Sequence, residues 1–86
     1  YSASKYAVTG FARALSSEVR KKGLRVVNVM PGPVNTPIWE FMDTPMAPED
    51  MLTAREVAQA TINAMTVSAT QVIEDVLLLP QKGLYF

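Results

Sequence analysis

A mostly apolar segment at positions 24–30 sets the strongest constraint on the fold of this chain. The run contains three valines, which favour extended backbone, and its hydrophobic residues show little of the alternation typical of a half-exposed strand. This pattern predicts a strand that is covered on both faces, as in a parallel sheet. The sequence Pro31-Gly32-Pro33 should end the strand, because a proline cannot donate a hydrogen bond to a neighbouring strand.

An amphipathic pattern over residues 1–22 predicts a long helix directly before this strand. Gly23 is a typical residue just beyond the end of a helix. Gly10 lies inside the helix, which suggests that another backbone approaches it closely. The stripe expected to face the core has the spacing of one helix face and consists of Val8, Phe11, Ala12, Leu15 and Val19.

A long connection over residues 34–52 is predicted to be irregular, because it contains three prolines. Loops of this length that carry large apolar residues are usually lids or binding loops. The large apolar residues expected to be exposed here are Ile38, Trp39, Phe41, Met42 and Met46.

A second helix and a second strand complete the predicted order. Thr53 and Glu56 match a capping box, which opens a helix over about 54–66. Residues 72–79 form the second predicted strand, which Pro80 closes. The expected apolar face of the second helix is Val57, Ala58, Ile62 and Met65.

The order helix, strand, long loop, helix, strand predicts an α/β fold with one parallel βαβ unit. Two strands cannot form a covered parallel sheet, and the first strand is too apolar for an exposed edge. We therefore expect residues 1–86 to be the C-terminal portion of one larger α/β domain.

The composition excludes several kinds of site and partner. The chain has no cysteine and no histidine, which excludes disulfides, Cys–His zinc sites and nucleophiles paired with histidine within it. No metal site is expected, because the carboxylates are not spaced for one. Eight basic and eight acidic residues are scattered, so no nucleic-acid partner is expected. No run approaches the roughly 20 apolar residues of a membrane span, and a cytoplasmic setting is the default expectation.

Tyr1 and Lys5 stand four positions apart, so in a helix they lie on the same face. An ammonium held near a phenol favours the phenolate and lowers the pKa of the phenol from its ordinary value of about 10. Such a phenol can act as a general acid–base near neutral pH. Taken alone, this spacing occurs by chance in many helices. Ser2 and Lys5 also match the S-x-x-K motif of penicillin-recognising serine enzymes, but the S-D-N and K-T-G partners of that motif are missing.

The first motif gains meaning from the rest of the chain. The sequence Tyr1-Ser2-Ala3-Ser4-Lys5-Tyr6-Ala7-Val8 opens a helix, the strand at 25–30 follows, and Pro31-Gly32-Pro33-Val34-Asn35-Thr36 follows the strand. In this order and at this separation, the motifs resemble the C-terminal part of the short-chain dehydrogenase/reductase family. The resemblance covers essentially all 86 residues. It implies part of a Rossmann-like doubly wound parallel sheet and an oxidoreductase that moves a hydride between NAD or NADP and a small-molecule carbonyl or alcohol.

The resemblance also implies roles for the first helix. Tyr1 matches the catalytic acid–base, which donates a proton to a carbonyl oxygen or takes one from a hydroxyl. Lys5 matches the residue that lowers the pKa of the tyrosine and hydrogen-bonds the nicotinamide ribose.

Further roles are implied for the turn after the first strand and for the loop beyond it. Pro31 and Gly32 match the turn that lets backbone approach the nicotinamide. Val34 would hold the carboxamide through its main-chain N–H and C=O, and Thr36 through its hydroxyl, although Thr36 could instead cap the segment that follows. The residues that would line an apolar substrate pocket are Ile38, Trp39, Phe41 and Met42. Trp39 and Phe41 could instead pack on the domain.

Other features limit what this chain does by itself. The family's Gly-rich phosphate loop, its catalytic Ser and Asn, and the residue that selects NAD or NADP are absent from these 86 residues. The chain alone is therefore expected to be inactive, and the alternative is a non-catalytic α/β fragment that serves only as an association segment. A homo-oligomer, dimer or tetramer, is expected for a full-length parent. Glu74 and Asp75 are expected to be edge or interface charges rather than catalytic groups.

Overall fold

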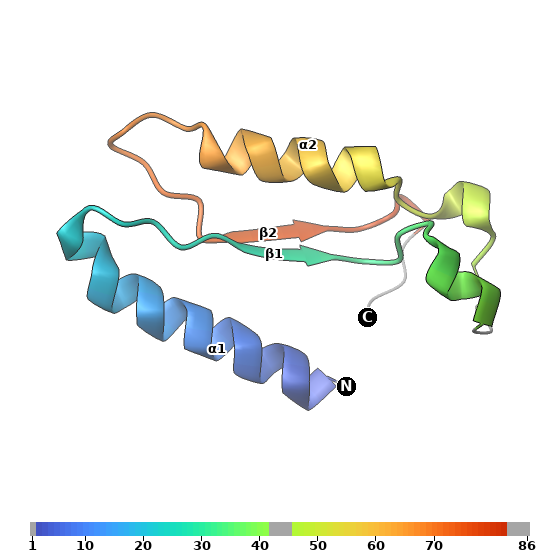
Figure 1. The fold of residues 1–86 in the computed structure, drawn as a ribbon, viewed down its shortest axis with the longest axis horizontal. Helices are drawn as coiled ribbons and strands as arrows, with labels where there is room; N and C mark the ends of the chain where they lie inside the picture. Colours follow the sequence, from blue (N-terminus) through green and yellow to red (C-terminus); the bar gives the residue numbers. More distant parts are fainter. Residues whose placement is uncertain (1, 42–45, 83–86) are drawn as a thin grey trace.

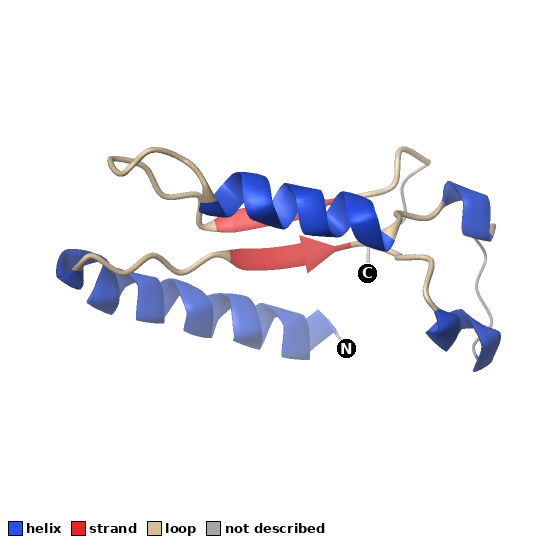
Figure 2. Ribbon diagram, turned by 45° about the horizontal axis from the view of Figure 1, so that its top comes forward, coloured by secondary structure: helices blue, strands red, loops and turns tan. Residues whose placement is uncertain are grey.

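The computed structural model describes residues 2–41 and 46–82. Helix α1 spans Ser2–Val19, strand β1 Asn28–Pro31, helix α2 Ala54–Met65 and strand β2 Asp75–Leu78. In both ribbon views the two strands lie side by side between α1 and α2, so the helices cover opposite faces of the strands (Figure 1 and Figure 2). The predicted α/β fold and the predicted order of its elements are confirmed.

The two strands are parallel, as the βαβ order predicts, with Asn28 opposite Asp75 and Pro31 opposite Leu78. Both strands are shorter than the predicted ranges 24–30 and 72–79. The strand was expected to end before Pro31, but Pro31 is its last residue. In a parallel pair, every second residue of a strand donates its N–H to the neighbouring strand. Here the N–H groups of Asn28 and Gly32 donate to the carbonyls of Glu74 and Leu78, so Pro31 is not at a donor position. The missing N–H of Pro31 therefore costs β1 no bond to β2.

The predicted helix ends agree closely with the structure. Helix α1 continues as the 3-10 turn Arg20–Lys22 and ends at Gly23, which has a left-handed φ of 84°. The capping box of α2 is present, because Thr53 Oγ1 accepts from the Glu56 N–H at 3.1 Å and Glu56 Oε1 accepts from the Thr53 N–H at 2.8 Å.

The predicted core-facing stripe of α1 is confirmed for Ala12 and Val19, which are half-buried, and is wrong for its three large side chains. Phe11 is 70% exposed, and Val8 and Leu15 are also exposed. The residues of α1 that are buried or half-buried follow a different stripe: Lys5, Thr9, Ala12, Ser16 and Val19. Most side chains on this face of the helix are small, and two of them are polar. Thr9 and Ser16 form hydrogen bonds with the side chains of Asn28 and Glu74 at the start of the two strands. A Cβ at Gly10 would have no atom within 4 Å, so the expected close approach there is also wrong among the described residues.

Helix α2 differs from its prediction in the same way. Ile62 and Met65 are exposed, the latter to 61%, whereas Ala64 is buried. Ala58 is exposed as well, and Val57 alone of the predicted face is half-buried. The face of α2 that packs inward is therefore built from smaller side chains than the sequence pattern indicates.

The connection between β1 and α2 is less irregular than expected. It contains the 3-10 helices η2 (Pro37–Phe41) and η3 (Pro48–Asp50) and a parallel bridge between Val34 and Leu52. Met46 is 7% exposed, which contradicts its expected exposure, and Met51 and Leu52 are also buried. Across the ranges that the structure describes, no helix is long and apolar enough to cross a bilayer.

Candidate functional site

The predicted site residues of the turn follow β1 at the carboxyl end of the strands. Helix α1 runs antiparallel to the strands, so its amino-terminal end lies toward the same end of the sheet (Figure 1 and Figure 2). In open parallel sheets, ligands bind in the crevice outside the carboxyl ends of the strands. The topology therefore places the start of α1 and the turn after β1 on the side of the sheet where a ligand is expected.

Gly32 is packed closely against residues far away in the sequence. It is buried, and its N–H donates to the Leu78 carbonyl at 2.8 Å. A Cβ on Gly32 would lie 3.0 Å from Cδ of Pro80 and 3.3 Å from Cδ2 of Leu79. The glycine thus lets the turn lie against the residues that follow β2, a reason additional to the expected approach of a ligand.

The main-chain N–H and C=O of Val34 both point away from Leu52, the residue that lies opposite Val34 in a parallel bridge. The bridge to Leu52 uses the flanking residues, because the Leu52 N–H donates to the Pro33 carbonyl at 2.9 Å and the Asn35 N–H donates to the Leu52 carbonyl at 2.8 Å. In a parallel ladder this pattern directs the N–H and C=O of the residue in between to the opposite side. Within the described residues the Val34 N–H has no hydrogen-bond partner.

Trp39 folds back onto this turn. Its indole Nε1–H donates to the Val34 carbonyl at 2.7 Å, and its backbone N–H donates to the Thr36 carbonyl at 3.2 Å. Thr36 therefore directly precedes η2 and accepts a backbone bond from it, and within the described ranges its hydroxyl has no hydrogen-bond partner. The side chain of Trp39 is half-buried.

The remaining predicted loop residues are only partly described. Ile38 is 58% exposed. The backbone of Phe41 ends η2, but its side chain lies outside the described residues, as does all of Met42. The structure therefore brings together Val34, Thr36 and Trp39 of the predicted set and leaves Ile38 at the surface.

Lys5 lies on the sheet-facing side of α1 and is half-buried. One turn further along, Thr9 accepts a hydrogen bond from Asn28 Nδ2 at 3.2 Å and donates one to Met30 Sδ at 3.6 Å. This contact fixes the rotation of α1 about its axis, so Lys5, four residues earlier, faces the same side. Tyr1 lies outside the described residues.

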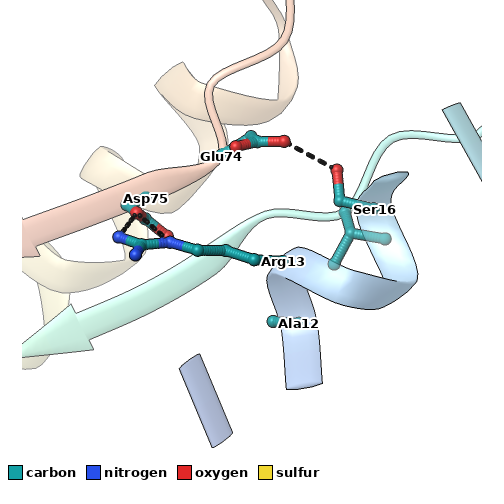
Figure 3. Close-up of a pocket in the computed structure, with 6 residues that line it drawn as sticks. Ala12, Arg13, Ser16, Glu74 and Asp75 are labelled. Atoms are coloured by element: carbon teal, nitrogen blue, oxygen red, sulfur yellow. Dashed lines mark hydrogen bonds and ion pairs between the residues drawn. The ribbon is translucent and has the colours of Figure 1, made fainter. Parts of the chain in front are cut away.

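A charged cluster that the sequence did not reveal fastens α1 to β2 at the opposite end of the strands (Figure 3). Arg13 contacts Asp75 Oδ2 through Nη2 at 2.6 Å and Nε at 3.2 Å. Ser16 is 1% exposed and donates to Glu74 Oε1 at 2.9 Å, and Arg20 forms an ion pair with the same oxygen. The expected edge or interface charges are therefore bonded within the chain.

The pocket beside these charges is not a promising ligand site. It has an empty volume of about 150 Å³ that includes open solvent, and ion-paired side chains form much of its lining. It also lies at the amino end of β2, away from the turn after β1. The sequence signal that could have indicated this cluster is a pair of arginines, Arg13 on α1 and Arg20 in the 3-10 turn after it. They match the adjacent acidic residues before and at the start of β2.

Comparison with known proteins shows which family this chain resembles. A model of the short chain dehydrogenase family matches residues 1–47. The chain is 29% identical over 83 residues to a sepiapterin reductase of Chlorobaculum tepidum, covering 96% of this chain and 34% of that protein. It is 34% identical over 80 residues to an uncharacterized oxidoreductase of Staphylococcus saprophyticus, covering 93% of this chain and 33% of that protein.

A solved structure extends the likeness to the whole fold. The crystal structure of a β-ketoacyl-[ACP] reductase from Bacteroides thetaiotaomicron matches with a TM-score of 0.85 and 28% identity, covering 95% of this chain and 36% of that one. This match confirms that the chain forms part of a Rossmann-like parallel sheet. The chain spans about a third of the length of the curated relatives it matches. Since the family model covers more than half of its residues, the chain belongs to the short chain dehydrogenase family, a family of oxidoreductases.

Proposed function

We propose that residues 1–86 are the C-terminal portion of an NAD(P)-dependent oxidoreductase that acts on a small-molecule carbonyl or alcohol. The rest of its Rossmann-like domain would supply the phosphate loop and the remaining catalytic groups. The coverage of about a third of each relative supports this division.

The observation that carries the proposal is the pair of main-chain groups on Val34. A carboxamide has one acceptor oxygen and an NH₂ donor, so it complements an N–H and a C=O presented side by side. Val34 presents such a pair away from Leu52, immediately after the carboxyl end of β1. Thr36, whose hydroxyl has no partner within the described residues, would add a third contact to the carboxamide.

The nicotinamide, when bound, supplies or accepts the hydride at the substrate carbon. In the reducing direction, the Tyr1 hydroxyl donates its proton to the substrate oxygen as the C–O double bond becomes a single bond. Lys5 stabilises the resulting phenolate and hydrogen-bonds the ribose. Pro31 and Gly32 shape the turn against which the ring lies, and Val34 and Thr36 determine which face of the ring meets the substrate.

The loop after this turn would contact the substrate through Ile38, Trp39, Phe41 and Met42. These side chains are apolar, and Ile38 is exposed next to the turn. Contacts of this kind favour a substrate with an apolar portion beside the reacting carbonyl.

A specific observation also favours an association role. Val8, Phe11 and Leu15 form an exposed apolar stripe along α1, and apolar surface of this kind is buried in stable protein interfaces. We infer that the full-length protein is a homo-oligomer, dimer or tetramer, in which α1 contributes to the interface. If the chain has no catalytic role, this association is the function that remains.

The test of the catalytic proposal uses the full-length gene product that carries this sequence. NADH and NADPH are assayed against ketones, β-ketoacyl compounds and sepiapterin, the last two chosen from the names of the similar proteins. Tyr1→Phe should abolish carbonyl reduction and leave cofactor binding nearly unchanged. Turnover equal to that of the unmodified protein would remove Tyr1 from the role of acid–base.

A further inference from the structure

The hydrogen bond from Trp39 to Val34 joins the start of the loop to the turn after β1. The indole N–H reaches back five residues to the Val34 carbonyl oxygen at 2.7 Å. The backbone of Trp39 is itself held by the Thr36 carbonyl at 3.2 Å. The ring therefore closes a small unit that runs from Val34 through Thr36 to η2.

The peptide group between Val34 and Asn35 is held from both sides by this contact. Its N–H donates to the Leu52 carbonyl at 2.8 Å, and its C=O accepts from the Trp39 indole. With both atoms bonded to different segments, the peptide plane cannot rotate without breaking one of the two bonds. The direction of the Val34 carbonyl is thereby set before any ligand binds.

A carbonyl oxygen has two lone pairs, and the indole uses one of them. The second lone pair stays open to another donor. The Val34 N–H has no acceptor within the described residues, so it can donate to a ligand oxygen. A ligand that displaced the indole would break the 2.7 Å hydrogen bond of a half-buried tryptophan, which is unfavourable. Sharing of the oxygen between the indole and a ligand NH₂ is therefore the favoured arrangement.

We propose that Trp39 is a positioning residue for the carboxamide of the nicotinamide. This inference rests on the proposed function, since it requires that Val34 hold that carboxamide. Trp39 aims the Val34 carbonyl at the carboxamide NH₂ and ties the loop that begins at η2 to the occupied turn. Cofactor affinity and the position of the loop are coupled through this one bond.

The test measures dissociation constants on the full-length protein and its Trp39→Phe variant. Three ligands are compared: NAD(P)⁺, the matching ADP-ribose or 2′-phospho-ADP-ribose, which lacks nicotinamide, and the 3-acetylpyridine analogue, which lacks only the NH₂. Trp39→Phe should raise the dissociation constant of NAD(P)⁺ about five- to tenfold. The dissociation constants of the other two ligands should change by less than about twofold, because neither ligand presents the NH₂ donor.

A second substitution protects the test against a packing defect. Replacement of Trp39 by 3-benzothienylalanine keeps the bicyclic ring and removes only the N–H, so it should give the same selective loss. A loss of equal size for all three ligands, or no loss for NAD(P)⁺ in either variant, overturns the role of Trp39.

The failure of the inference and that of the proposed function give different results. If the unmodified protein does not bind NAD(P)⁺, the proposed function fails and the inference fails with it. If it binds NAD(P)⁺ and the 3-acetylpyridine analogue equally well, the contact between the Val34 carbonyl and the carboxamide NH₂ is absent and the inference alone fails. If the unmodified protein prefers NAD(P)⁺ and the Trp39 variants keep the full preference, the inference alone fails.

Discussion

Arg13 on α1 and Asp75 at the start of β2 form an ion pair in which two guanidinium nitrogens contact the same carboxylate oxygen, at 2.6 and 3.2 Å. Figure 3 shows this pair beside the hydrogen bond between Ser16 and Glu74. Together with the ion pair between Arg20 and Glu74, these contacts fix how α1 lies against the strands. The position of the amino-terminal end of α1, and hence of Lys5, depends on that packing.

Arg13→Met should lower the free energy of unfolding by at most about 1 kcal/mol, because the Arg13 side chain is 61% exposed and such pairs are screened by solvent. The loss should shrink further in 1 M salt. Urea unfolding of the full-length protein at low and high salt measures both effects. A larger loss that is independent of salt would mean that packing rather than charge holds α1 here.

Ser16→Ala should cost more than the exposed ion pair, about 1–3 kcal/mol, because it removes a buried hydroxyl that bonds to Glu74 and leaves a partly buried acceptor without that donor. Ser17→Ala is the matched control, since Ser17 is the next residue on the same helix and is exposed. Its effect should stay within about 0.5 kcal/mol. Equal losses for the two alanine variants would contradict the account of this contact.

Two glycine-to-alanine changes should have opposite signs. Gly32→Ala places a Cβ 3.0 Å from Cδ of Pro80 and should destabilise the protein by about 1–3 kcal/mol through overpacking. Gly10→Ala meets no atom within 4 Å in the middle of α1 and should stabilise it by up to about 1 kcal/mol through helix propensity. Thermal unfolding midpoints of the two variants measure the contrast. A destabilising Gly10→Ala would show that another part of the protein covers that position.

Phe11→Glu should weaken self-association of the full-length protein without unfolding it, because Phe11 is 70% exposed in the middle of the apolar stripe on α1. Analytical ultracentrifugation should show a smaller species, while circular dichroism stays unchanged. Glu18→Gln is a matched control on an exposed position of the same helix. An unchanged oligomeric state in the Phe11 variant would remove α1 from the proposed interface.

The sequence patterns identified the elements better than they identified the partners of those elements. The capping box at Thr53 and Glu56 and the stop at Gly23 are local signals, and both were predicted correctly. The apolar stripe on α1 correctly indicates a helix, but periodicity does not say which surface covers the stripe. The side that faces the strands is recognised by hydrogen-bonding residues such as Thr9 and Ser16 instead.

In the candidate site, too, the sequence predicted local features and did not predict tertiary contacts. The motif order placed Val34 and Thr36 just after β1, which follows from the end of a predicted strand. The reason for Gly32 lies in Pro80, 48 positions later, and the contact between Trp39 and Val34 depends on the fold of η2. Neither relation has a pattern that a single sequence displays, because both arise from tertiary packing.

The most direct test of the account follows the hydride itself. The full-length protein is given NADH or NADPH with deuterium at one of the two C4 positions of the nicotinamide, together with a carbonyl substrate found in the assay. Mass spectrometry of the alcohol should find the deuterium on the former carbonyl carbon with one of the two labelled forms and not with the other. Alcohol that forms without deuterium from either labelled form would contradict hydride transfer from the nicotinamide.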